Sequence, residues 1–334
     1  MNSIIDNIQS YNFQVYSSHP LFLLAVFVLA SFLMIWRLQA MENKGFEGTV
    51  LGTLIMPYCS GFANLVFAYV MSSSASNGGL VIENALVNNA TNLTLILGLA
   101  VVFGSTAAMQ NGNPGQKKPA DSHRINRLNL LFTLIALFLF SGTLWALAKD
   151  GVLDFYDGLV LVGLFVFWQV LHVFEILKDN IRKNKTFHWS LLFDLMLIAA
   201  SAYGVYFAVD HLVEWVSKGE SPFFSFAKLG WLSGALMVVP NAFLALYYSR
   251  IGRQDIVLSS QIGDGHICIP MGIGLFSLFN PIQVPGFFQT GLFVILGAGA
   301  AHFLSIAFLG RVPRFMGVGL LGAYAFFLYK GIIQ

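Results

Sequence analysis

Apolar stretches recur along the whole of this 334-residue chain. They have the length of about 20 residues that an α-helix needs to cross the hydrocarbon core of a bilayer. Charged residues make up only 10% of the chain, whereas soluble domains carry roughly 25%, so there is too little polar surface to cover a water-soluble particle. Lipid cannot satisfy exposed backbone groups, which favours helices. The sequence therefore predicts an all-α polytopic membrane protein.

The apolar stretches predict ten transmembrane helices. We place these spans at 21–40, 47–71, 79–104, 128–148, 154–177, 189–210, 227–249, 255–279, 286–308 and 313–331. Spans one to five form residues 1–178, spans six to ten form residues 189–334, and 179–188 is a short cytoplasmic linker.

Basic residues predict the orientation of these spans. With the N-terminus outside, fourteen of the 18 Lys and Arg residues fall in cytoplasmic loops, as the positive-inside rule requires. The C-terminus is then outside as well, and we expect the plasma (cell inner) membrane. The bilayer is the expected partner. Because the basic residues are confined to loops, we expect no nucleic-acid binding. The sequence does not indicate an oligomeric state.

Two parts of the chain resemble each other. Residues 80–99 align with residues 256–275 at an offset of 176, and the spans before them align so that Pro57 is equivalent to Pro240. A proline inside a span removes a helical hydrogen bond. Five spans per half is an odd number, so the halves insert with opposite orientation, and inverted repeats with paired broken helices indicate a midplane binding site. The alternative is that both prolines are ordinary helix kinks.

Polar residues also repeat within these segments. Asn84, Asn88 and Asn92 are four residues apart and share one helix face. Their partners at the same offset are Ser260, Asp264 and Cys268. Polar groups at this depth are expensive in lipid and are expected to face the bundle interior or a wet cavity. The alternative is that they join helices by hydrogen bonds.

These segments resemble the two α-repeats of the sodium/calcium exchanger (cation/Ca²⁺ antiporter) superfamily. That family combines Gly-Thr-Ser-Leu-Pro-Glu on one helix with Gly-Asn-x-x-Gly-Ser-Asn-x-x-Asn/Asp on the next. Residues 83–92 (ENALVNNATN) and 259–268 (SSQIGDGHIC) correspond to the second pattern. The resemblance implies two inverted five-helix repeats, with an ion site between spans two, three, seven and eight.

The chain departs from this family at the charged positions. The glutamate that follows each proline is replaced by Tyr58 in the first half and Asn241 in the second. Asp264 is a new carboxylate at a family serine position. Calcium takes six to eight oxygen ligands, commonly including carboxylates, so standard Na⁺/Ca²⁺ exchange is in doubt. Asp264 could instead carry a proton or pair with a monovalent cation.

The resemblance implies a secondary cation antiporter that works by alternating access, with Ca²⁺, Na⁺, K⁺ or H⁺ as the ion. Asp264 is the expected charge-bearing ligand. The other candidate ion-binding positions are Tyr58, Asn84, Asn88, Asn92, Asn241, Ser260 and Cys268. Glu83 could recruit cations at the entrance or be an ordinary interfacial acid. We expect no cofactor besides the transported cation.

The sequence also bears on two other functions. An exchanger-fold protein without transport activity would keep the scaffold for binding, sensing or assembly, and the missing glutamates favour it. An enzyme is not expected, because no histidine shares the helix face of Asp264 and Cys268 to activate a thiolate.

Overall fold

The computed structural model describes residues 19–43, 56–72, 77–104, 120–180, 190–218, 225–250 and 254–333, and it is mostly helical. Up to residue 180 the elements are α2 (Pro20–Asn43), α4 (Met56–Met71), α5 (Gly78–Ala90), η3 (Thr91–Ile96), α6 (Leu97–Phe103), α7 (Ala120–Leu147), η4 (Ala148–Asp150), β1 (Val152–Leu153) and α8 (Phe155–Asn180). They are followed by α9 (Ser190–Ser217), η5 (Phe226–Lys228), α10 (Leu229–Met237), α11 (Val239–Arg250), α12 (Gln254–Ile267), η6 (Cys268–Ile273), α13 (Gly274–Ser277), β2 (Ile282–Gln283), α14 (Phe288–Leu309) and α15 (Arg314–Ile333). The strands β1 and β2 form a short antiparallel pair.

Six stretches of the described helices are long and apolar enough to cross a membrane. They are Pro20–Arg37, Gly78–Phe103, Arg127–Asp150, Leu192–Ser217, Phe226–Arg250 and Phe288–Leu309. Gly61–Met71 and Phe155–Leu171 are also apolar but shorter. The prediction of a helical protein with membrane-spanning segments is therefore confirmed, while the number of ten spans stays a prediction.

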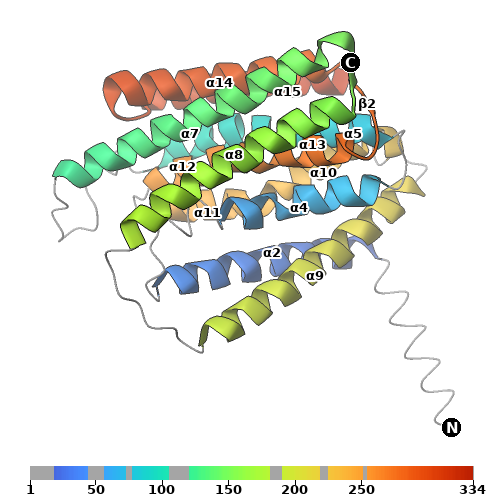
Figure 1. Ribbon diagram of the computed structural model, residues 1–334, viewed down its shortest axis with the longest axis horizontal. Helices are drawn as coiled ribbons and strands as arrows, with labels where there is room; N and C mark the ends of the chain where they lie inside the picture. The colour runs from blue at the N-terminus through green and yellow to red at the C-terminus, as the bar shows by residue number, and fades with distance from the viewer. Residues whose placement is uncertain are drawn as a thin grey trace, which may run out of the picture.

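The helices form a bundle with a central layer (Figure 1). Helices α2 and α9 lie side by side along one edge, and α7, α14 and α15 lie along the opposite edge. Helices α5, α12 and α13 run between them. Of the span Gly78–Phe103, 78% is buried inside the protein, against 28% to 50% for the other five. This central span is therefore shielded from lipid mainly by other helices.

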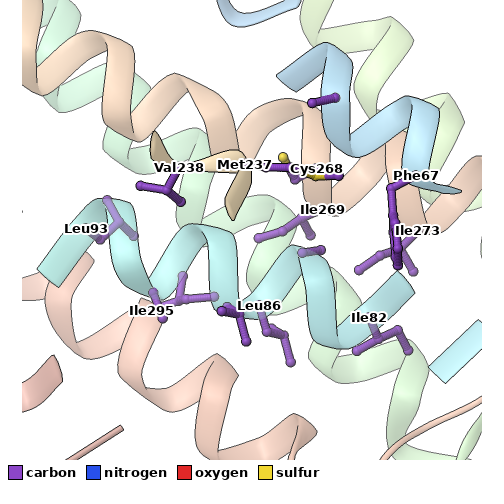
Figure 2. Packing of buried hydrophobic residues seen from close by; sticks show 14 of the residues in the cluster. Phe67, Ile82, Leu86, Leu93, Met237, Val238, Cys268, Ile269, Ile273 and Ile295 are labelled. Atoms are coloured by element: carbon purple, nitrogen blue, oxygen red, sulfur yellow. The ribbon is translucent and has the colours of Figure 1, made fainter. Parts of the chain in front are cut away.

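Apolar side chains fill the space around the central helices. Figure 2 shows Leu86 and Leu93, from α5 and η3, beside Ile295 of α14, and Met237 beside Cys268. Leu86, Leu93 and Ile295 are all fully buried. Polar groups in this region therefore lie in an apolar environment, where each needs a hydrogen-bonding partner.

Both central helices contain a π-helical turn. Thr91–Ile96 forms η3 between α5 and α6, and Cys268–Ile273 forms η6 between α12 and α13. A π-turn leaves the regular i→i−4 hydrogen-bond ladder and is frequent at functional sites. Pro270 lies within η6 and has no N–H to donate. The sequence reading did not anticipate either turn.

A third interruption lies at Pro240. Helix α10 ends at Met237 and α11 begins at Val239, so the span is broken next to this proline, as expected from the sequence. Pro57 is the second residue of α4. The residues before Met56 lie outside the described part, so the equivalent break in that span stays a prediction.

Two glycines let α10 approach α5 closely. A Cβ added at Gly230 would lie 2.7 Å from the Leu80 carbonyl oxygen, and one added at Gly234 would lie 2.7 Å from the Asn84 carbonyl oxygen. Small residues four apart are typical of tightly packed membrane helices. This contact fixes the first turns of α5, which carry Glu83 and Asn84, against α10.

An ion pair joins α2 to α9 at their interface. Arg37 Nη1 donates to Asp194 Oδ1 at 3.4 Å, and the Asp194 side chain is fully buried. A buried charge that loses its partner is strongly destabilising, so the two side chains should be energetically coupled.

We expect the effects of Arg37→Gln and Asp194→Asn on stability to be non-additive. Each single variant should lower the unfolding midpoint in detergent, because it leaves the other charged group without its counter-charge. The double variant should lose less than the two losses combined, with a coupling of about 0.5–3 kcal/mol for groups in contact. Additive losses would show that this contact does not stabilise the α2–α9 pair.

Candidate functional site

A fully buried carboxylate lies at the centre of the bundle. Asp264 belongs to α12, and its Oδ2 accepts a hydrogen bond from Asn92 Nδ2 at 2.8 Å and another from Asn241 Nδ2 at 3.0 Å. Asn92 lies in the π-turn η3, and Asn241 lies one residue after Pro240 in α11. The carboxylate therefore joins three helical segments that are distant in the sequence.

The same network extends to two more residues. Asn92 Nδ2 also donates to Asn88 Oδ1 at 3.1 Å, and the Cys268 thiol donates to the same oxygen at 4.0 Å. Asn88 is fully buried and Cys268 nearly so. We refer to Asn88, Asn92, Asn241, Asp264 and Cys268 as the central polar cluster. It contains one carboxylate, three amides and one thiol.

Two atoms of the central polar cluster have no hydrogen-bond partner among the described residues. They are Asn88 Nδ2 and Asn92 Oδ1, and both are buried. A buried polar atom left unsatisfied costs about 1–3 kcal/mol, and buried polar groups in folded proteins are normally paired with protein or water. Asn88 Nδ2 is therefore available as a donor, and Asn92 Oδ1 as an acceptor, for a polar partner.

The remaining side of Asp264 faces α4. A Cβ added at Gly61 would lie 3.8 Å from Asp264 Oδ1 and 3.0 Å from Ile267 Cγ2. Gly61 follows one turn after Pro57, so the start of α4 approaches the cluster. The side chain of Tyr58, a candidate ion-binding position, lies outside the described part.

Three predicted site residues make contacts outside the cluster. Asn84 Nδ2 donates to Ser233 Oγ at 2.9 Å and lies 3.4 Å from Met237 Sδ, so it joins α5 to α10. Ser260 Oγ donates to the Val257 carbonyl at 3.1 Å within its own helix. Glu83 lies against α10, since a Cβ at Gly230 would be 2.8 Å from Glu83 Oε2.

Three buried polar residues of the bundle were not predicted from the sequence. Asn89 donates to the Ala85 carbonyl at 2.7 Å, and its Oδ1 lies close to Gly265. Asn64 on α4 is 3% exposed, and neither polar atom of its side chain has a hydrogen-bond partner in the described part. His302 on α14 is fully buried. The run of adjacent asparagines was a signal for Asn89, whereas Asn64 and His302 stand alone in apolar sequence.

His302 supports the π-turn that carries Asn92. Its Nε2 lies 2.9 Å from the Leu93 carbonyl oxygen, which can only accept, so Nε2–H is the donor. Leu93 follows Asn92 directly within η3. His302 therefore fixes the backbone next to the amide that contacts Asp264. A second histidine, His266, turns away from the cluster toward the Thr133 carbonyl at 2.9 Å.

The central polar cluster is suited to binding a small cation. Its carboxylate supplies one negative charge and its amides supply neutral oxygens, which are hard ligands suited to hard cations. Cys268 donates to an amide oxygen rather than to a base. In the part of the chain that the structure describes, no group of three or more His, Cys, Asp or Glu residues is placed to hold a metal ion.

The long apolar helices indicate an integral membrane protein. Residues 20–174 match the family described as "Sodium/calcium exchanger protein". The matched stretch is a little under half of the chain, and it contains the first of the two repeat motifs, residues 83–92. No curated relative matches the sequence.

Solved structures of the sodium-calcium exchanger NCX_Mj share this fold. The structure soaked with 100 mM Na⁺ and 10 mM Sr²⁺ is 17% identical, has a TM-score of 0.66, and matches over 93% of this chain and 97% of that one. The structure soaked with 2.5 mM Na⁺ and 0.1 mM Sr²⁺ is 18% identical, with a TM-score of 0.65 over 92% and 95% of the two chains. At this identity the likeness concerns the fold.

We expect His302→Leu to destabilise the protein, because the Leu93 carbonyl would stay buried without its donor. The expected loss is about 1–3 kcal/mol, measured as a lower unfolding midpoint in detergent. His302→Gln keeps an N–H donor and should lose less. A control is His211→Leu, since the half-buried His211 ring is hydrogen-bonded to the Phe207 carbonyl of its own helix. Equal midpoints for His302→Leu and the wild type would contradict the supporting role.

Proposed function

We propose that this protein is a secondary cation antiporter that works by alternating access, with Asp264 as the charge-bearing ion ligand. The observation that carries the proposal is the fully buried carboxylate held by two amides from different helices. A buried ionisable group inside a membrane bundle is costly and marks ion pathways in membrane proteins. Na⁺, K⁺, Ca²⁺ and H⁺ are the candidate ions for this function.

The proposed architecture is ten spans in two inverted halves, residues 1–178 and 189–334, joined by the linker 179–188. The two π-turns support it, because η3 begins at Thr91 and η6 at Cys268, close to the offset of 176 found in the sequence. The contacts of Asp264 also support it, since Asn92 comes from the first half and Asn241 from the second. A site at such an interface changes its access when one half rocks against the other.

The proposed binding step exchanges hydrogen bonds for ion ligands. Without a cation, the amide N–H groups of Asn92 and Asn241 neutralise part of the charge on Asp264 Oδ2. An arriving cation would take the carboxylate, and rotation of the amides would turn their oxygens toward it. Asn88 is the third amide within reach of this rearrangement, through its contact with Asn92. Glu83, on the α10 side of α5, is the proposed recruiting acid at the entrance.

A second candidate function is a transport-inactive membrane protein that uses the exchanger scaffold for binding, sensing or assembly. The observation in its favour is that Tyr58 and Asn241 stand where the family resemblance implies glutamates. In that case the central polar cluster would serve only to join helices. Neither candidate is an enzyme.

Asp264→Asn separates the two candidates. The amide is nearly isosteric and removes the cost of a buried charge, so the fold should survive with equal or higher stability. Tracer flux of Na⁺, K⁺ and Ca²⁺ and proton flux in proteoliposomes should fall to the background of empty vesicles. Asp210→Asn makes the same chemical change at a half-exposed position of α9 and should leave flux unchanged. Wild-type flux at background for every ion would favour the scaffold function.

Ten spans, together with the distribution of the basic residues, predict that both termini face outward in the plasma membrane. An even number of spans returns the chain to the side on which it began. Epitope tags fused to the two ends should both react with antibody in intact cells, while a tag inserted in 179–188 should react only after permeabilisation. Termini on opposite sides would exclude ten spans.

A further inference from the structure

We infer that a hydrogen-bonded junction between α6, α11 and α12 is the cytoplasmic gate of this protein, and that it opens when α11 tilts away. The junction consists of the side chains of Ser249 and Gln254 and the backbone carbonyl of Ala100. This inference rests on the proposed function, because it names the contact that closes the central polar cluster on one side of the membrane.

The junction is built around one backbone carbonyl. Ser249 Oγ, in the last turn of α11, donates to the Ala100 carbonyl oxygen at 2.8 Å. Gln254 Nε2, from the first residue of α12, donates to the same oxygen at 3.3 Å and to Ser249 Oγ at 3.1 Å. Ser249 is almost fully buried. Helices α11 and α12 lie side by side (Figure 1), and these bonds attach both of them to the end of α6.

These bonds are not needed to cap α6. The Ala100 carbonyl already accepts the backbone N–H of Gly104 at 2.9 Å, and one partner satisfies a buried carbonyl. Ser249 and Gln254 add donors from two other helices. Gly104 leaves room for them, because a Cβ at this position would overlap both side chains. The junction therefore joins helices beyond what the end of α6 requires.

Each segment of the junction also carries a residue of the central polar cluster. The pairs are Asn92 with Ala100, Asn241 with Ser249, and Asp264 with Gln254, separated by eight, eight and ten residues. At about 1.5 Å per helical residue, the junction lies roughly 12–15 Å from the cluster along these segments. Opening the junction therefore separates the segments that enclose the cluster.

Under the proposed topology, the junction faces the cytoplasm. The stretch 250–253, between Ser249 and Gln254, contains Arg250 and Arg253. The positive-inside rule assigns such a basic loop to the cytoplasmic side. A path from Asp264 to the cytoplasm along α6, α11 and α12 is then closed by the junction.

Helix α11 has a hinge at its other end. A break between Met237 and Val239 separates it from α10, and Gly230 and Gly234 hold α10 closely against α5. Helix α11 can therefore tilt about the break while α10 stays in place, and Ser249 at its far end moves most. Opening is inexpensive, because the polar groups of the junction exchange their protein partners for water.

A related contact joins helix ends at the opposite face. The offset of 176 between the repeats pairs Gly104 with Asn280, since 280 − 104 = 176. Asn280 follows α13, and its Nδ2 donates to the Ser72 carbonyl at the end of α4, at 3.1 Å. Under the proposed topology this contact faces outside. Weakening the two contacts should therefore change access to the cluster from opposite sides.

The chain contains a reporter for this access. Cys268 belongs to the cluster and is almost fully buried, and in a Cys59→Ala chain it is the only cysteine. The full chain is placed in vesicles of known orientation, and a membrane-impermeant methanethiosulfonate is added on one side at a time. Ser249→Ala and Gln254→Leu should each raise the rate of Cys268 modification from the cytoplasmic side. The expected increase is about threefold to tenfold, the effect of one ordinary hydrogen bond, with no change from outside.

Three further variants test the sidedness. Gly104→Ala removes no hydrogen-bonding group but displaces the two side chains of the junction, so it should also raise the cytoplasmic rate. Asn280→Leu should raise the rate from outside instead. Ser201→Ala removes a buried hydroxyl that is bonded within its own helix, to the Leu197 carbonyl, and should change neither rate.

The outcomes separate the gate from a structural contact and from the proposed function. Faster modification from both sides in Ser249→Ala and Gln254→Leu, with lower unfolding midpoints, would show that the junction only holds the fold together and would overturn the gate. Unchanged modification in every junction variant would overturn it as well. Ion flux is measured separately in the same vesicles. Wild-type flux at background for every ion would overturn the proposed function, while sided modification of Cys268 would still support the control of access by the junction.

Discussion

The structure depends on keeping one carboxylate in the middle of an apolar bundle. Asp264 is fully buried, and its Oδ2 is held by the amides of Asn92 and Asn241. Hydrogen bonds to a carboxylate offset part of the cost of removing it from water. They do so only if the donors are held in fixed positions, and the segments that carry Asn92 and Asn241 hold them there.

The backbone irregularities lie where those donors are needed. Asn92 is in the π-turn η3, Cys268 begins the π-turn η6, and Asn241 follows the break beside Pro240. A regular helix repeats its faces every 3.6 residues, and a π-turn or a break changes the direction of the side chains that follow. Close packing at Gly230 and Gly234 holds α10 against α5, and His302 secures the Leu93 carbonyl. The irregular backbone is thus confined to segments covered by protein, as the absence of water in a bilayer requires.

Much of the fold and part of the candidate site could be predicted from the sequence. The rest could not, and both outcomes have physical reasons. Apolar stretches of span length predict helices because lipid leaves the backbone few alternatives. The spacing of Asn88, Asn92 and their equivalents Asp264 and Cys268 predicts shared faces, and the structure brings these four together. Asn84 has the same spacing, yet it contacts Ser233, because the glycines of α10 close on that turn. Packing between segments that are distant in the sequence decides which of these regularly spaced residues contacts which neighbouring helix. For the same reason His302, the Arg37–Asp194 pair and the π-turns left no local pattern.

The position of the charge is the main difference from the pattern that the repeats resemble. In that pattern, each half carries a glutamate next to its proline, so the two halves contribute acids symmetrically. Here the second half supplies Asp264 on α12, and its equivalent in the first half is Asn88. The amide and the carboxylate are nearly the same size, so the packing around them need not differ. Within the central polar cluster, the carboxylate therefore comes from α12 alone. Among the described residues, Asp264 meets the first part of the chain through Asn92, which also bonds Asn88, and at Gly61 of α4. Under the proposed function, these contacts are where ion binding would be coupled to the relative motion of the two halves.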